Sequence, residues 1–172
     1  MLKVRYRNYI IMDRNVDGMP TFDCEELALF GYGTIKGICS AIDSRRLQND
    51  LTLAFKEAEE AALRADPCAY VKRMHEVGAI SYNGMESVHL AIDGWSCNHD
   101  TPVINLPGVR MKTVKAAADE AGVRVDKKGP KGEWWVFVTM NGQANRRTVM
   151  AEAARDAMKL HGFNAKVWYK AD

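Results

Sequence analysis

The feature that most restricts the fold is the order of hydrophobic periodicities between residues 102 and 170. Short runs rich in Val, Ile and aromatic residues, with apolar groups at every second position, are typical of strands. Longer runs with apolar groups three and four residues apart are typical of amphipathic helices. The chain places these runs in the order strand, helix, strand, strand, helix, strand. The expected elements cover residues 102–106, 109–122, 123–128, 133–140, 144–162 and 163–170.

This βαββαβ order resembles that of ferredoxin-like domains. Such a domain packs both helices on one face of a four-stranded antiparallel sheet and leaves the other face without helices. We therefore expect residues 101–172 to form a ferredoxin-like domain that follows a separate N-terminal portion, residues 1–100. The resemblance is to a topology, and a topology shared by many unrelated proteins implies no function by itself.

The N-terminal portion predicts a mixture of strands and helices. Residues 2–12 alternate at first, are rich in Val, Tyr and Ile, and predict one strand. The Asp-Gly pair at 17–18 predicts a turn. Asp50 is a suitable N-cap for a helix that ends before Pro67. The expected fold class of the whole chain is therefore α+β.

The secondary structure of other parts of the first hundred residues is less clearly predicted. Residues 69–78 predict a second short helix, and the Asn-Gly pair within residues 79–93 predicts a hairpin. Residues 34–42 fit a buried strand and a short helix equally well, so the fold of residues 21–49 is left open.

Composition excludes several classes of protein. With 172 residues, of which 47% are hydrophobic and 27% charged, the chain can bury a core and is not of the disordered type. No apolar run approaches the roughly 18 residues that span a bilayer. The first residues lack the apolar stretch of a signal peptide, so we expect a cytoplasmic protein without membrane contact.

Charge is divided unequally along the chain. Residues 1–107 have a balance of −4, whereas residues 108–172 have a balance of +6. The basic C-terminal part therefore favours an acidic partner, or contact between the two parts of the chain.

Strand alternation predicts which side chains occupy the face without helices. Trp134 is expected to point toward the helices with Val136, so that Trp135 points away from them. The same reasoning, together with the lysine-rich turn between the second and third strands, predicts one aromatic and basic surface. Its expected residues are Arg124, Lys127, Lys128, Lys131, Trp135, Phe137, Lys166, Trp168 and Lys170.

An aromatic and basic surface of this kind fits a non-catalytic binding protein, such as a regulator or inhibitor of a larger assembly. The expected partner is another protein or a second copy of the chain, because exposed aromatic patches mark protein contacts. The alternative is single-stranded nucleic acid, whose bases stack on aromatic rings and whose phosphates attract lysines. The third strand lacks the glycine-aromatic signature of RNA-recognition modules.

Two further patterns carry hypotheses of their own. Arg146 and Arg147 lie in the first turn of a helix, where cations oppose the helix dipole, and this placement predicts an anion-binding site. The simpler interpretation is a pair of solvated arginines.

Cys97 and His99 share a loop and offer a second alternative, a cysteine- or zinc-dependent enzyme. The four cysteines, at 24, 39, 68 and 97, have no metal-clip spacing. We therefore expect no catalytic residue, metal or cofactor.

Overall fold

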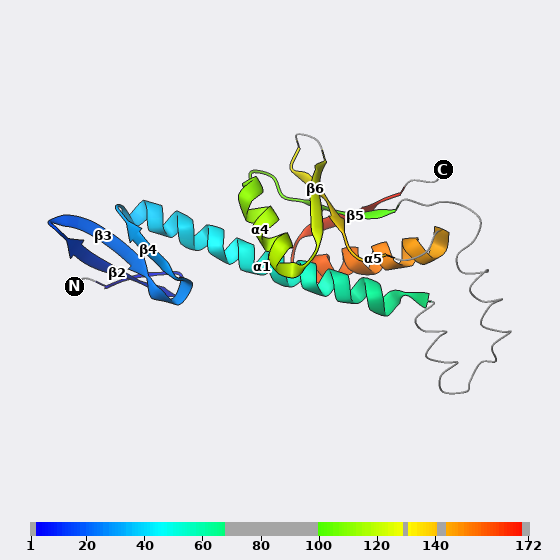
Figure 1. The fold of residues 1–172 in the computed structure, drawn as a ribbon, viewed down its shortest axis with the longest axis horizontal. Helices are drawn as coiled ribbons and strands as arrows, with labels where there is room; N and C mark the ends of the chain where they lie inside the picture. Colours follow the sequence, from blue (N-terminus) through cyan, green and yellow to red (C-terminus); the bar gives the residue numbers. More distant parts are fainter. Residues whose placement is uncertain (1–2, 68–99, 129–130, 141–143, 170–172) are drawn as a thin grey trace, which may run out of the picture. The chain divides into compact units, whose positions relative to one another are not determined.

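The computed structural model describes residues 3–67, 100–128, 131–140 and 144–169 (Figure 1). Its contacts divide the chain into two compact units, Met1–Asn49 and Asp50–Asp172. Helix α1 (Ile35–Ala65) runs through the boundary between the units. The predicted boundary at residue 100 adjoins residues outside the described part and stays a prediction. The expected α+β class is confirmed.

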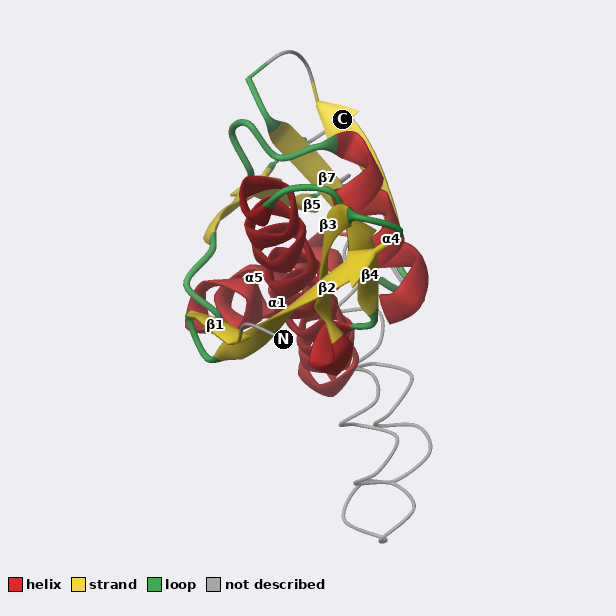
Figure 2. Cartoon of the chain, turned by 90° about the vertical axis from the view of Figure 1, so that its left-hand side faces the viewer, coloured by secondary structure: helices red, strands yellow, loops and turns green. Residues whose placement is uncertain are grey.

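The first unit contains a four-stranded antiparallel sheet in the order β1-β2-β3-β4 (Figure 2). Its strands are β1 (Lys3–Tyr6), β2 (Tyr9–Val16), β3 (Met19–Cys24) and β4 (Leu29–Tyr32). A short 3-10 helix, η1 (Glu25–Leu27), joins the last two strands.

The predicted turn at residues 17–18 is confirmed. Asp17 and Gly18 have φ angles of 52° and 79°, and they join Val16 to its cross-strand partner Met19. Positive φ at both central residues is the conformation that a two-residue hairpin favours, and an Asp-Gly pair supplies it at low cost.

The single strand predicted over residues 2–12 is wrong. The chain reverses at Arg7, which has a φ of 54°, so that β1 and β2 form a hairpin with Tyr6 opposite Tyr9. The polar pair Arg7 and Asn8 interrupts the alternation at this point, and asparagine is common in turns. The sequence therefore carries a sign of the reversal, but this sign is weaker than the Asp-Gly pair at 17–18.

The helix predicted to begin at Asp50 begins at Ile35. Its first turn is capped by Thr34, whose side-chain oxygen accepts a hydrogen bond from the Gly37 N–H at 3.0 Å. Ile38 and Ile42 are fully buried in the core of the first unit, and this burial accounts for the apolar residues in the first turns of the helix. The predicted end of the helix is confirmed, because α1 stops at Ala65, before Pro67.

The second unit has the expected ferredoxin-like topology. In chain order it contains β5 (Thr101–Asn105), α4 (Met111–Ala121), β6 (Arg124–Lys128), β7 (Glu133–Phe137), α5 (Ala144–Leu160) and β8 (Asn164–Trp168). The strands form one antiparallel sheet in the order β6-β7-β5-β8. Gly122, with a φ of 74°, ends α4 as predicted.

A layer of helices covers one face of this sheet. Helix α4 contacts β6, and α5 contacts β5 and β8. The C-terminal half of α1 belongs to the same unit: Leu51 and Phe55 are fully buried, and the hydroxyl of Thr52 donates to the carbonyl of Ala117.

The helix and the hairpin predicted for residues 69–93 lie outside the described residues. None of the helices that the structure describes combines the length and the apolar character needed to cross a membrane.

Candidate binding face

The two adjacent tryptophans of β7 point to opposite faces of the sheet, as strand alternation predicts. Trp134 is 2% exposed and Val136 is fully buried, both toward the helices. Trp135 and Phe137 are half-buried on the other face. We call this other face, with Arg124, Lys128, Trp135, Phe137, Lys166 and Trp168, the aromatic–basic face.

Three aromatic rings meet on the aromatic–basic face. The ring centroids of Trp135 and Trp168 lie 5.7 Å apart with an interplanar angle of 46°. The Trp135 and Phe137 rings are 6.3 Å apart and nearly perpendicular, at 72°. Such tilted and edge-to-face contacts are favoured by the quadrupoles of aromatic rings.

Small residues on the central strand β5 allow the two indoles to meet. Val103 lies opposite Trp135 and Thr101 lies opposite Trp168, on the two flanking strands. Both β5 residues are buried, Val103 at 1% exposure and Thr101 at 5%. Sequence reasoning missed these two residues, although their alternation within β5 would have placed them on this face.

Cations lie on the faces of the aromatic rings. The guanidinium carbon of Arg124 lies 4.0 Å from the centroid of Phe137, its direct cross-strand partner. The ammonium of Lys128 lies 4.7 Å from the Trp168 ring and 5.5 Å from the Trp135 ring. Cations at these distances are attracted by the negative ring faces.

Glu133 is an acidic member of this face that sequence reasoning missed. Its carboxylate pairs with the ammonium of Lys166. This hydrogen bond, with the charges of Lys166, Lys128 and Lys131, lowers the pKa of Glu133 below its ordinary value of 4.5. Glu133 lies two residues before Trp135 on one strand, so alternation would have found it.

Not all the predicted residues join the aromatic–basic face. Lys127 lies opposite Trp134 in the strand register, so its side chain belongs to the other side of the sheet. Lys127 lines a pocket there together with the stem of Lys131, whose charge still acts on Glu133. Lys170 lies outside the described residues.

The two arginines at the start of α5 have partners within the chain. Arg146 forms two hydrogen bonds of 2.8 Å with the carboxylate of Asp66, and both side chains are largely buried. Arg147 donates to the carbonyl of Asp100 at 3.2 Å. These contacts account for cations at this helix end, and the anion-binding site stays a prediction.

The alternative cysteine or zinc site lies outside the described residues, because Cys97 and His99 do. Cys24 is buried and Cys39 half-buried, and burial raises the pKa of both thiols. Within the described part of the chain, no three His, Cys, Asp or Glu side chains gather as metal ligands would.

No protein-family model, curated protein or solved structure matches this chain. Its function is therefore inferred from the geometry of the aromatic–basic face.

Proposed function

We propose that this chain is a non-catalytic binding protein whose aromatic–basic face binds an acidic segment of a partner protein. The observation that carries the proposal is the position of Arg124 and Lys128 on the rings of Phe137, Trp135 and Trp168. Positive charge and apolar surface coincide there. A segment with carboxylates beside aliphatic side chains complements both properties.

The ring geometry favours a protein over nucleobases. A base stacks on an open ring face, but cations cover the faces of Phe137 and of the Trp135–Trp168 pair. The two indoles are also inclined by 46°, so they form no flat platform. Carboxylates, in contrast, can bind the cations without displacing them from the rings.

Charge disfavours a second copy bound through the same face. Such a contact would bring together two surfaces on which the cations Arg124, Lys128 and Lys166 outnumber the carboxylates Asp126 and Glu133. Like net charge on both sides of an interface costs free energy.

A peptide-display selection on the full chain tests the proposal. A random peptide library is selected for binding to the wild type, and the enriched peptides are then measured against Trp135→Ala. Phe30→Ala is the matched control, because Phe30 is an aromatic residue of the first unit that is 59% exposed. Labelled single-stranded DNA and RNA are titrated in parallel.

We expect enriched peptides that combine Asp or Glu with Leu or Phe. Trp135→Ala should weaken the binding of these peptides about tenfold, because it removes a central aromatic residue. Phe30→Ala should leave their binding unchanged. A selection without such peptides, or peptides insensitive to Trp135→Ala, would contradict the proposal. Tighter binding of single-stranded nucleic acid that depends on Trp135 would replace it with the nucleic-acid alternative.

A further inference from the structure

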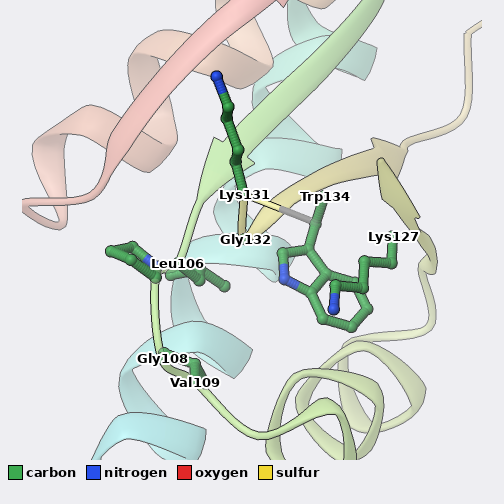
Figure 3. Close-up of a pocket in the computed structure, with 8 residues that line it drawn as sticks. Leu106, Gly108, Val109, Lys127, Lys131, Gly132 and Trp134 are labelled. Carbon is green, nitrogen blue, oxygen red and sulfur yellow. The ribbon is translucent and has the colours of Figure 1, made fainter. Parts of the chain in front are cut away.

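A pocket of about 390 Å³ lies beside the β6–β7 hairpin, on the side of the sheet away from the aromatic–basic face (Figure 3). The loop that leads from β5 into α4 forms one wall, and the hairpin forms the other. The lining residues are Leu106, Pro107, Gly108, Val109, Lys127, Lys131, Gly132 and Trp134. Its volume lies within the range of small-molecule sites.

Trp134 contributes an unsatisfied hydrogen-bond donor to this pocket. The residue is 2% exposed, and its indole N–H is buried without an acceptor among the described residues. In Figure 3 the indole nitrogen is turned toward the space beside Leu106 and Gly132. A buried donor without a partner is unfavourable, so this position favours an acceptor atom from a ligand.

The two walls of the pocket are fixed to each other by the backbone. The Leu106 N–H donates to the carbonyl of Gly132 at 2.8 Å. Gly132 has a φ of 79°, and a Cβ on it would lie 2.9 Å from the Cα of Pro107. Only glycine allows this close approach, which holds the two walls of the pocket together.

The charge and polarity of the lining define the class of ligand. Lys127 lies directly opposite Trp134 in the register and brings one ammonium to this side of the sheet. The ammonium of Lys131 points away from Trp134 in Figure 3, so only the stem of this lysine lines the pocket. Leu106, Pro107 and Val109 add apolar surface.

We propose that this pocket binds a small organic carboxylate. One carboxylate oxygen accepts from the Trp134 indole N–H, and the negative charge is balanced by Lys127. The apolar body of the ligand packs against the loop that precedes α4. A phosphate dianion fits less well, because the side chains of the pocket offer it one ammonium and one neutral donor.

Nitrogen–proton correlation spectra of the full chain test this site through the indole N–H signals of the four tryptophans. The probe is benzoate, with benzamide as its uncharged counterpart and inorganic phosphate as the competing anion. Each signal is assigned by replacing one tryptophan with phenylalanine. Lys127→Met removes the proposed cation, and Lys159→Met is the matched control at an exposed lysine of α5.

Benzoate should shift the Trp134 signal saturably and leave those of Trp135 and Trp168 in place. Lys127→Met should weaken this binding about tenfold, and Lys159→Met should not change it. The proposal is overturned if benzoate gives no saturable shift, if benzamide binds as tightly, or if phosphate binds more tightly. Insensitivity to Lys127→Met would also overturn it. None of these outcomes bears on the aromatic–basic face.

Discussion

Arg124 and Phe137 face each other directly across β6 and β7, and the guanidinium carbon lies 4.0 Å from the centroid of the ring. The cation therefore covers one face of the apolar ring, and the Arg124 residue is still exposed to solvent. Lys128 also lies over a ring, with its ammonium 4.7 Å from the centroid of Trp168, although its cross-strand partner is Glu133. Contacts with the rings, together with the ion pair of 3.5 Å between Arg124 and Asp126, thus hold charges of the aromatic–basic face in place.

The Arg124–Phe137 contact should stabilise the second unit measurably. Arg124→Met is expected to lower the free energy of unfolding by about 0.5–1 kcal/mol, and a double-mutant cycle with Phe137→Leu should assign most of this to the pair. All four tryptophans lie in the second unit, so their fluorescence during urea unfolding reports its stability. Lys115→Met, at an exposed lysine of α4 in the same unit, is the control. Equal losses of unfolding free energy for Arg124→Met and Lys115→Met, or a cycle without coupling, would contradict the contact.

The buried pair of Asp66 and Arg146 should be sensitive to removal of one partner. Its side chains are 7% and 15% exposed, so Asp66→Asn leaves a buried cation and should cost about 3 kcal/mol of unfolding free energy. The double variant Asp66→Asn with Arg146→Met should cost less than the two single variants together. The exposed pair Glu60–Arg64 is the control, and Glu60→Gln should cost about 0.3–0.5 kcal/mol. Strict additivity at Asp66 and Arg146 in urea unfolding would rule this coupling out.

Two glycines with the same backbone conformation should differ in their tolerance of alanine. Gly132 and Gly108 have φ angles of 79° and 74°, but an added Cβ meets Pro107 at 2.9 Å only at Gly132. Gly108→Ala should therefore lower the free energy of unfolding by about 1 kcal/mol, because only the backbone conformation is unfavourable for alanine there. Gly132→Ala should cost about 1–3 kcal/mol more, because the two loops must separate. Similar thermal unfolding temperatures for the two variants would show that the loops do not pack in this way.

Glu133 should titrate below the ordinary pKa of a glutamate, because Lys166 stabilises its charged form. Since its pKa is lower in the folded than in the unfolded protein, its contribution to stability is complete above about pH 4.5. That contribution is lost as the pH falls through the folded-state pKa. Titration of the side-chain carboxyl carbon by NMR should give a midpoint below 4.5 in the wild type.

The matched variants for this titration are Lys166→Met and Lys36→Met. The first removes the hydrogen-bond partner and should raise the midpoint toward 4.5, whereas the second removes an exposed lysine of the first unit and should not. A Glu133 midpoint that is the same in all three proteins would contradict the pairing with Lys166.

The topology of the second unit, and the sides to which the residues of β7 and β8 point, were predictable because these two strands alternate cleanly. Trp134 was placed inward and Trp135 outward from their neighbours Val136 and Phe137 alone. The proximity of Trp135 to Trp168 was harder to predict, because it depends on Val103 and Thr101 of the intervening strand. Their role follows from the strand order.

Other features depend on contacts that no local pattern reveals. The start of α1 was misplaced because Asp50 is the stronger N-cap by residue type, although Thr34 can also cap a helix. The burial of Ile38 and Ile42 against the first sheet favours the earlier start at Thr34. The pairing of Arg146 with Asp66 joins residues far apart in the sequence. The pocket beside Trp134 likewise depends on the close approach of Gly132 to Pro107.

The most direct measurement for the aromatic–basic face is the dissociation constant of one selected acidic peptide for the wild type, Lys128→Glu and Lys159→Glu. The two variants change net charge equally, but only Lys128 lies on the tryptophan rings. We predict that Lys128→Glu weakens binding at least about tenfold at physiological salt, while Lys159→Glu changes it less than about twofold. Equal effects of the two variants would mean that net charge, and not this face, binds the partner.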